Sequence, residues 1–466
     1  MKIKQYLMLL FIPSMLVSCN DVLDIDPPTS SLTADATYSS IGGIEAAHIG
    51  LYTGNFHNNP IYYQYLDVYL SMFSDDMKHR LNSWSAYYAN EYTTQNSVIG
   101  YIWSYAYSSI YQSNDFISRL SSSDLLSEST KNQYIGEAYW FRAYDYLLLV
   151  NLFGDVPKVT STTYDENSTS PRTPKSEIFD LIISDLQQSQ KLLESSTEGN
   201  TRVTADAATA LLARAYLHAE QWDNAVAEAS KLIPTDDKGS GTKYKLAEFS
   251  RIYKANSSET ILQSNQSGFG GSDTYVGYTR PGILFIPYTT RANYLLSDAL
   301  VADIRSDSSD LRNDWVGVLK SGSTTYYYPY KYKNDDTPSS SDDYEYLIFL
   351  RLTEQYLIRA EAYARLGNCS DAVNDINRVR KRAGQGEFAS SDKDEILLEI
   401  ETQRRKEFFS EQAFRWIDLN RTGRADVVYP STGYKVWEPY KKLLPIPYNE
   451  IGRNTNLTQN QGYDEL

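Results

Sequence analysis

The sequence predicts a mostly α-helical protein in which helical hairpins form a scaffold beside an irregular, loop-rich half. Three observations support this prediction. Apolar residues recur at helical spacing along residues 130–153 and 175–194. A second helical pattern occurs twice, at 205–233 and 353–381. Between these two copies, residues 235–345 are rich in Gly, Ser, Tyr and Asp and have little helical period.

The composition is that of an acidic globular protein. The 466 residues include 44 Lys and Arg and 59 Asp and Glu, a formal net charge of −15. Such a chain lacks the concentrated positive charge that phosphate backbones require, so no nucleic-acid partner is expected. Only four His occur, which weakens the case for a zinc enzyme or a Ser/His hydrolase. No metal or cofactor is expected, whereas the 40 Tyr supply many flat rings with a polar tip.

The N-terminus has the pattern of a bacterial lipoprotein signal. Two lysines precede the apolar run 6–17, which is too short to span a bilayer, and small residues then lead to Cys19. We therefore expect a signal peptide over residues 1–18, a lipid on Cys19, a polar tether over 19–35 and a single folded domain over 36–466. The alternatives are a plain signal followed by an ordinary buried Cys, or a short membrane anchor.

Helices follow the tether. The aromatic-rich segments 61–73 and 98–120 have three- and four-residue spacings, and the strong helix at 130–153 is stopped by Gly154 and Pro157. The helix at 130–153 and the helix at 175–194 are a candidate third hairpin, joined by a long insert.

The two later copies share the spacing of tetratricopeptide hairpins. In each copy a Tyr, Tyr216 or Tyr363, precedes an Ala by nine residues and follows a small residue by three. Small residues let two helices approach closely, and the Tyr fills the gap between them. Tetratricopeptide-like repeats are therefore expected over about 130–234 and 350–411, and a further helical element lies near 392–411.

The loop-rich insertion at about 235–345 separates these repeats. Its short runs at 259–263, 283–288 and 326–332 are expected to be strands or loop arms. Insertions of this kind are where binding residues usually lie.

Motifs for metalloproteases, phosphate loops, dinucleotide binding and serine hydrolases are absent. The acidic run at 303–310 lacks the mid-loop Gly and terminal Glu of a calcium loop. A two-carboxylate glycoside hydrolase remains an alternative, because the spatial separation of its carboxylates cannot be derived from a sequence.

Aromatic residues in predicted loops are the candidate ligand-binding residues. The apolar face of a sugar ring stacks on Trp or Tyr, while its hydroxyls bond to polar neighbours. Trp84 is the leading candidate because polar residues flank it; four other Trp lie in helical patterns and are expected in the core, namely Trp103, Trp140, Trp222 and Trp416. The predicted binding set is Asp76, Arg80, Asn82, Trp84, Tyr87, Tyr88, Tyr275, Tyr278 and Trp315.

The C-terminal stretches 443–451 and 454–463 resemble the ending of the SusD/RagB family of outer-membrane nutrient-binding lipoproteins. Further motifs occur in the family's order: Ser74-Asp75-Asp76, Phe141-Arg142-Ala143, Gly154-Asp155-Val156-Pro157, Arg404-Arg405-x-Glu407 and Arg415-Trp416-x-Asp418-Leu419. One departure is Glu411-Gln412-Ala413, where the family usually has Glu-Gly.

The resemblance implies a SusD-like fold and a non-catalytic protein that binds oligo- or polysaccharide at the cell exterior. It implies a lipid anchor in the outer membrane and delivery of the glycan to a SusC-like TonB-dependent transporter. Trp84 falls roughly where the starch-binding member keeps a binding Trp. Two further alternatives are a peptide-binding member of the same family and a protein-interaction scaffold without a small ligand.

Overall fold

The computed structural model describes residues 34–57, 60–196, 198–236, 240–264, 276–288 and 291–463. The predicted signal peptide, Cys19, most of the predicted tether and Tyr275 lie outside the described residues. Within these ranges no helix combines the length and the apolar character needed to cross a membrane.

Two long helices dominate the N-terminal half. α5 (Ser97–Ser121) packs on α6 (Glu128–Phe153), and α6 packs on α8 (Lys175–Leu192). The side chains of Asn96 and Ser127 accept hydrogen bonds from backbone N–H groups in the first turns of α5 and α6, which fixes where these helices begin. The shorter helical elements of this half are α1 (Ala34–Thr37), α2 (Ile41–Tyr52), the π-helical η2 (Thr53–His57) and η3 (Ile61–Tyr69), α3 (Leu70–Phe73), η4 (Asn82–Trp84), α4 (Ser85–Tyr88) and α7 (Tyr164–Asn167).

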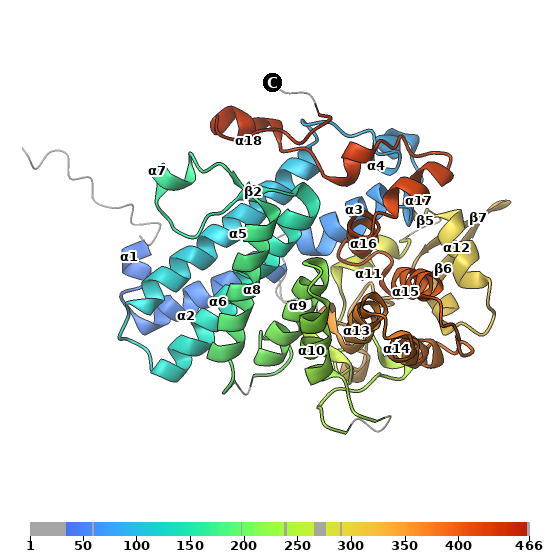
Figure 1. Cartoon of the computed structure of the whole chain (residues 1–466), viewed down its shortest axis with the longest axis horizontal. Helices are drawn as coiled ribbons and strands as arrows, with labels where there is room; N and C mark the ends of the chain where they lie inside the picture. Colours follow the sequence, from blue (N-terminus) through green and yellow to red (C-terminus); the bar gives the residue numbers. More distant parts are fainter. Residues whose placement is uncertain are drawn as a thin grey trace, which may run out of the picture.

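Helical hairpins continue this scaffold. α9 (Ala205–His218) packs on α10 (Trp222–Leu232), α10 contacts α13 (Leu352–Leu366), and α13 packs on α14 (Cys369–Arg382). α15 (Lys393–Phe408) lies against α13 and α14, and Figure 1 shows these helices side by side. The mostly α-helical class and the packing of the helix at 130–153 on that at 175–194 are thus confirmed. The chain ends with α16 (Phe414–Arg421), α17 (Ala425–Ser431), η9 (Pro439–Lys442) and α18 (Tyr448–Arg453).

Strands form only short antiparallel pairs in the described part of the chain. β1 (Met77–His79) pairs with β5 (Tyr294–Leu296), and β4 (Thr260–Ser264) pairs with β8 (Leu347–Arg351). The other two pairs are β2 (Val156–Pro157) with β3 (Arg172–Thr173) and β6 (Val316–Ser321) with β7 (Thr324–Pro329). Short helical segments fill the rest of the loop-rich half: η5 (Phe249–Arg251), α11 (Arg280–Phe285), α12 (Asp298–Arg305), η7 (Leu311–Trp315) and η8 (Ser341–Asp343).

The run at 283–288 was expected to be a strand or loop arm, and that expectation is wrong for its first residues. They belong to α11, which begins at Arg280. The Thr279 side chain accepts a hydrogen bond from the Gly282 N–H, and Pro281 lies in the first turn, where its missing N–H costs nothing. The runs at 259–263 and 326–332 do contain strands, β4 and β7.

The core is shared by the helical scaffold and the loop-rich half. Trp103, Trp140 and Trp416 are buried as their helical positions predict, whereas Trp222 is only partly buried. A buried carboxyl, Asp145 of α6, lies within this core. It accepts hydrogen bonds from the Tyr62 hydroxyl and from the Ser109 hydroxyl. Burial raises the pKa of Asp145 from 3.8 to about 7, although these two hydrogen bonds lower it.

Asp145 is expected to make stability fall as pH rises. Between about pH 4 and pH 7 the folded state keeps a proton on Asp145 that the unfolded state releases. The contribution of Asp145 to the free energy of unfolding is therefore complete below about pH 4 and is lost as pH rises through about 7. Urea unfolding at pH 5 and pH 8 should show that Asp145→Asn, which cannot ionise, gains about 3 kcal/mol of stability relative to wild type between the lower and the higher pH. An identical pH dependence for the two proteins would contradict this origin.

Candidate functional site

Trp84 lies at the end of the short turn η4, directly after β1. β1 is held by β5, with His79 opposite Tyr294 and Met77 opposite Leu296. Pairing with β5 therefore brings a residue of the loop-rich half, Tyr294, next to a segment more than two hundred residues earlier in the chain. Trp84 itself is half-buried.

Aromatic rings surround Trp84. The His79 ring stacks on the indole with 4.4 Å between centroids, and the Tyr69 ring stacks on it at 5.6 Å. Tyr87 lies at 5.5 Å, and Tyr294 meets the indole edge-on at 6.3 Å. These contacts hold Trp84 in one orientation, so little conformational entropy remains to be lost when a ligand covers its exposed part.

Polar residues precede Trp84 in the chain. Asn82, two residues before it, is exposed, and Arg80 is half-buried directly after β1. The Arg80 Nε is buried and has no hydrogen-bond partner among the described residues. A guanidinium and an amide next to exposed ring surface can supply donors and acceptors to a hydroxyl-rich ligand. The structure thus brings Trp84 and Tyr87 together, Arg80 and Asn82 precede them closely in the chain, and half-buried Tyr88 follows in the same helix α4.

A buried carboxylate anchors this segment to the C-terminal helices. Asp75 receives Arg415 Nε at 2.7 Å and Arg405 Nη2 at 2.8 Å. Burial alone would raise the pKa of Asp75, but these two guanidinium groups hold it well below its ordinary value. The Ser297 hydroxyl, next to β5, donates to the Asp75 carbonyl oxygen at 2.6 Å. The position of the aromatic cluster therefore depends on Asp75.

Three of the predicted binding residues do not face solvent. Asp76 is fully buried, and its Oδ1 accepts from Arg405 Nε at 3.0 Å. Trp315 stacks on Phe249 at 4.7 Å and belongs to the core, and Tyr278 is buried before α11. Their neighbouring chain covers these side chains, so in this structure they are not available to a ligand. Of the predicted set, Tyr275 lies outside the described residues.

Three residues of the cluster were not predicted: His79, Tyr69 and Tyr294. Tyr69 ends η3, and its ring is largely buried. Nothing in the sequence pairs 77–79 with 294–296, so only the β1–β5 register reveals that Tyr294 lies at Trp84. Polar sequence neighbours mark Trp84, but they cannot mark a ring that arrives through long-range pairing.

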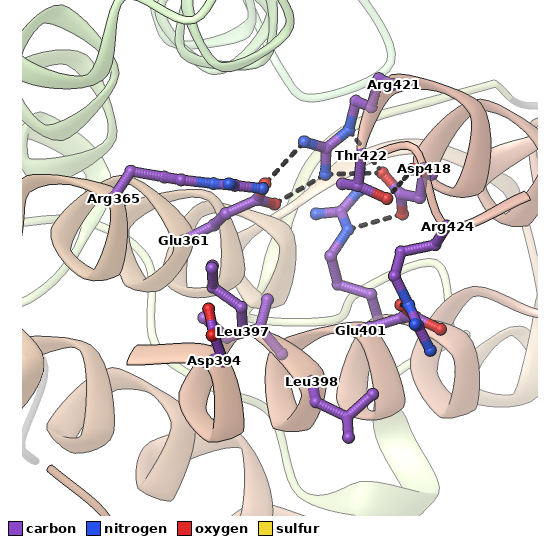
Figure 2. Close-up of a pocket in the computed structure, with 12 residues that line it drawn as sticks. Glu361, Arg365, Asp394, Leu397, Leu398, Glu401, Asp418, Arg421, Thr422 and Arg424 are labelled. Atoms are coloured by element: carbon purple, nitrogen blue, oxygen red, sulfur yellow. Dashed lines mark hydrogen bonds and ion pairs between the residues drawn. The ribbon is translucent and has the colours of Figure 1, made fainter. Parts of the chain in front are cut away.

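A separate cavity of about 370 Å³ lies between α13, α15 and α16. Figure 2 shows its charged lining, in which Arg421 bridges Glu361 and Asp418. Burial would raise the pKa of both carboxyls, but Arg421 lowers that of Glu361, and Arg404 with Arg421 lowers that of Asp418. Neither can serve as the protonated acid that glycoside hydrolysis needs near neutral pH. No aromatic ring lines this cavity.

No metal site accompanies these features. In the portion of the chain covered by the structure, no three His, Cys, Asp or Glu side chains come together in a group that could hold a metal ion.

Comparison with known proteins now identifies the family. A family model described as starch-binding and associating with the outer membrane matches residues 23–217, and the SusD family model matches residues 313–463. The chain belongs to the SusD/RagB family. It is 25% identical to a SusD-like protein of Formosa agariphila over 99% of this chain and 100% of that one.

The names of two further relatives state what those proteins bind. The starch-binding protein SusD of Bacteroides thetaiotaomicron is 32% identical over 146 residues, 28% of this chain and 24% of that protein. A laminarin-binding SusD-like protein of known structure has a TM-score of 0.74 at 22% identity, covering 91% of this chain and 100% of that chain. The second similarity supports the SusD-like fold.

Replacing Asp75 tests whether it anchors this segment. Asp75→Ala leaves the buried Arg405 and Arg415 without their shared partner and should lower the free energy of unfolding by about 3 kcal/mol. The matched control is Asp298→Ala, whose pair with Lys78 is exposed at 3.6 Å and should contribute less than about 1 kcal/mol. If urea unfolding shows the same loss of unfolding free energy in Asp75→Ala and Asp298→Ala, Asp75 is not an anchor.

Proposed function

We propose that the aromatic cluster around Trp84 binds an oligo- or polysaccharide without cleaving it. The observation that supports this most is the combination of a ring-clamped, partly exposed Trp84 with the polar residues Arg80 and Asn82 that precede it in the chain. Sugar rings have an apolar face and a polar rim, so a site for them needs both surfaces side by side. The relatives named for starch and for laminarin are consistent with a glycan as ligand.

Electrostatics favour a neutral glycan. The full chain has a formal net charge of −15, which repels strongly anionic ligands unless a local basic patch compensates. Arg80 supplies one positive charge beside Trp84 and forms no ion pair with any residue that the structure describes. A single guanidinium suits hydrogen bonding to hydroxyls better than it suits a polyanion.

The protein acts as a capture subunit in this proposal. It is held to the outer membrane by a lipid on Cys19, faces the cell exterior and passes the glycan to a SusC-like TonB-dependent transporter. Membership of the SusD/RagB family supports this role, and the packed helical hairpins offer a broad, continuous surface for a large partner. No step of this role requires covalent chemistry.

Trp84→Ala is the direct test of the binding site. Removing the indole should lower affinity for the best-binding glycan by about 30-fold, about 2 kcal/mol, because truncation of a central Trp costs this much at binding surfaces. Calorimetry with starch-derived and laminarin-derived oligosaccharides measures the change.

Trp222→Ala is the matched control, since Trp222 is also partly buried but lies on α10 of the scaffold. The Trp222→Ala variant should bind the glycan with the affinity of the wild type. Unchanged affinity in Trp84→Ala, for every glycan that binds the wild type, would remove this cluster as the site. Release of shorter sugars from the ligand would contradict binding without cleavage.

A further inference from the structure

A second hollow lies between the start of α5 and the short helix α18. Its volume is about 490 Å³, and its lining includes Tyr101, Asn96, Tyr448, Asn449 and the Glu450–Arg453 ion pair. The Tyr448 N–H donates to the Thr94 carbonyl oxygen at 3.0 Å, which ties α18 to the segment before α5. In Figure 1, α18 and α4 lie along the same upper edge of the molecule.

A chain of ring contacts joins this hollow to Trp84. The Trp84 ring contacts Tyr69 at 5.6 Å, and Tyr69 contacts Tyr65 at 5.6 Å. Tyr65 then stacks on Tyr101 at 6.1 Å, with their planes 14° apart. The last ring is on the surface, since half of Tyr101 is exposed. Tyr105 extends the row one turn further along α5, 6.3 Å from Tyr101. Ring contacts therefore connect the proposed site to the second hollow, through the largely buried Tyr69 to the exposed Tyr101.

The chemistry of the second hollow matches that of a sugar site. Its rings are the tyrosines of α5 and α18, Tyr101 and Tyr448, which are 50% and 42% exposed. The remaining lining is polar or small apart from Pro447, and no Leu, Ile, Val, Met or Phe is present. The centre of a protein–protein interface would be more apolar than this. Amides and an ion pair beside exposed rings instead suit the hydroxyls and flat faces of a glycan.

The sequence contains a signal for this surface. Tyr101 and Tyr105 are four residues apart and lie on the exposed side of α5, whereas Ile99 and Trp103 lie on its buried side. A helical position does not by itself make an aromatic residue part of the core.

We propose that the hollow between α5 and α18 is a second glycan subsite, and that the ligand is a chain long enough to contact Trp84 and Tyr101 at once. The proposal rests on the glycan-binding function proposed above. One neutral polysaccharide chain follows the row of rings from Trp84 over Tyr65 to Tyr101 and Tyr448. Binding at two linked subsites raises affinity for long chains over short ones, because the second contact is intramolecular.

Calorimetry on purified wild-type protein and on Tyr101→Ala tests the proposal, with disaccharides and long oligosaccharides from both starch and laminarin as ligands. Tyr101→Ala should weaken binding of the best long chain about five- to tenfold and leave disaccharide affinity unchanged. Tyr448→Ala should act in the same direction. The matched control is Tyr111→Ala, because Tyr111 lies on the same helix and is also 50% exposed, but it does not line the hollow.

Two results would overturn the second subsite: wild-type affinity for long chains in both Tyr101→Ala and Tyr448→Ala, or equal affinity of the wild type for short and long chains. A peptide whose binding is weakened by Tyr101→Ala, with glycan binding unchanged, would overturn it as well. Failure of the proposed function looks different. There the wild type itself shows no glycan-dependent signal at any chain length, or Trp84→Ala binds every glycan as tightly as the wild type does.

Discussion

The buried carboxylate of Asp75 is the constraint on which the geometry around Trp84 depends. It holds the segment after α3 against α15 through Arg405 and against α16 through Arg415. Lys435 reinforces the same segment, since its Nζ donates to the Phe73 carbonyl oxygen at 2.6 Å. Such buried ion pairs contribute more to a single arrangement than to net stability. Here they fix where β1 begins, and thereby where the turn η4, which ends at Trp84, is placed.

The scaffold could be predicted from the sequence because its signals are local. Helical period defines α6 and α8, with a Ser127 cap at the start of α6. Closely spaced small residues with Tyr216 or Tyr363 define the later hairpins. The turn at Gln412 and Ala413 could not be predicted in this way. Both residues have positive φ, 45° and 59°, without the usual Gly. Tertiary contacts hold this turn, among them a hydrogen bond from the Gln412 N–H to Asp67 at 2.7 Å.

The candidate site could be predicted only in part, because it combines local and long-range contacts. Trp84 is recognisable from its polar neighbours, but Tyr294 reaches it only through the β1–β5 register. Trp315 has equally polar neighbours in the sequence, yet stacking on Phe249 buries it. Tyr101 presents the reverse case, an exposed ring on a helix that a simple rule assigns to the core. Exposure of an aromatic residue depends on which face of its element is covered, and this follows from the packing of distant segments.

A crystal structure of the protein with a long oligosaccharide of starch or laminarin bound tests glycan binding at these rings most directly. We expect one intact sugar chain that lies over Trp84 and Tyr294 and extends past Tyr65 to Tyr101. Density for the sugar in the charged cavity between α13, α15 and α16, or density for a cleaved product, would contradict it.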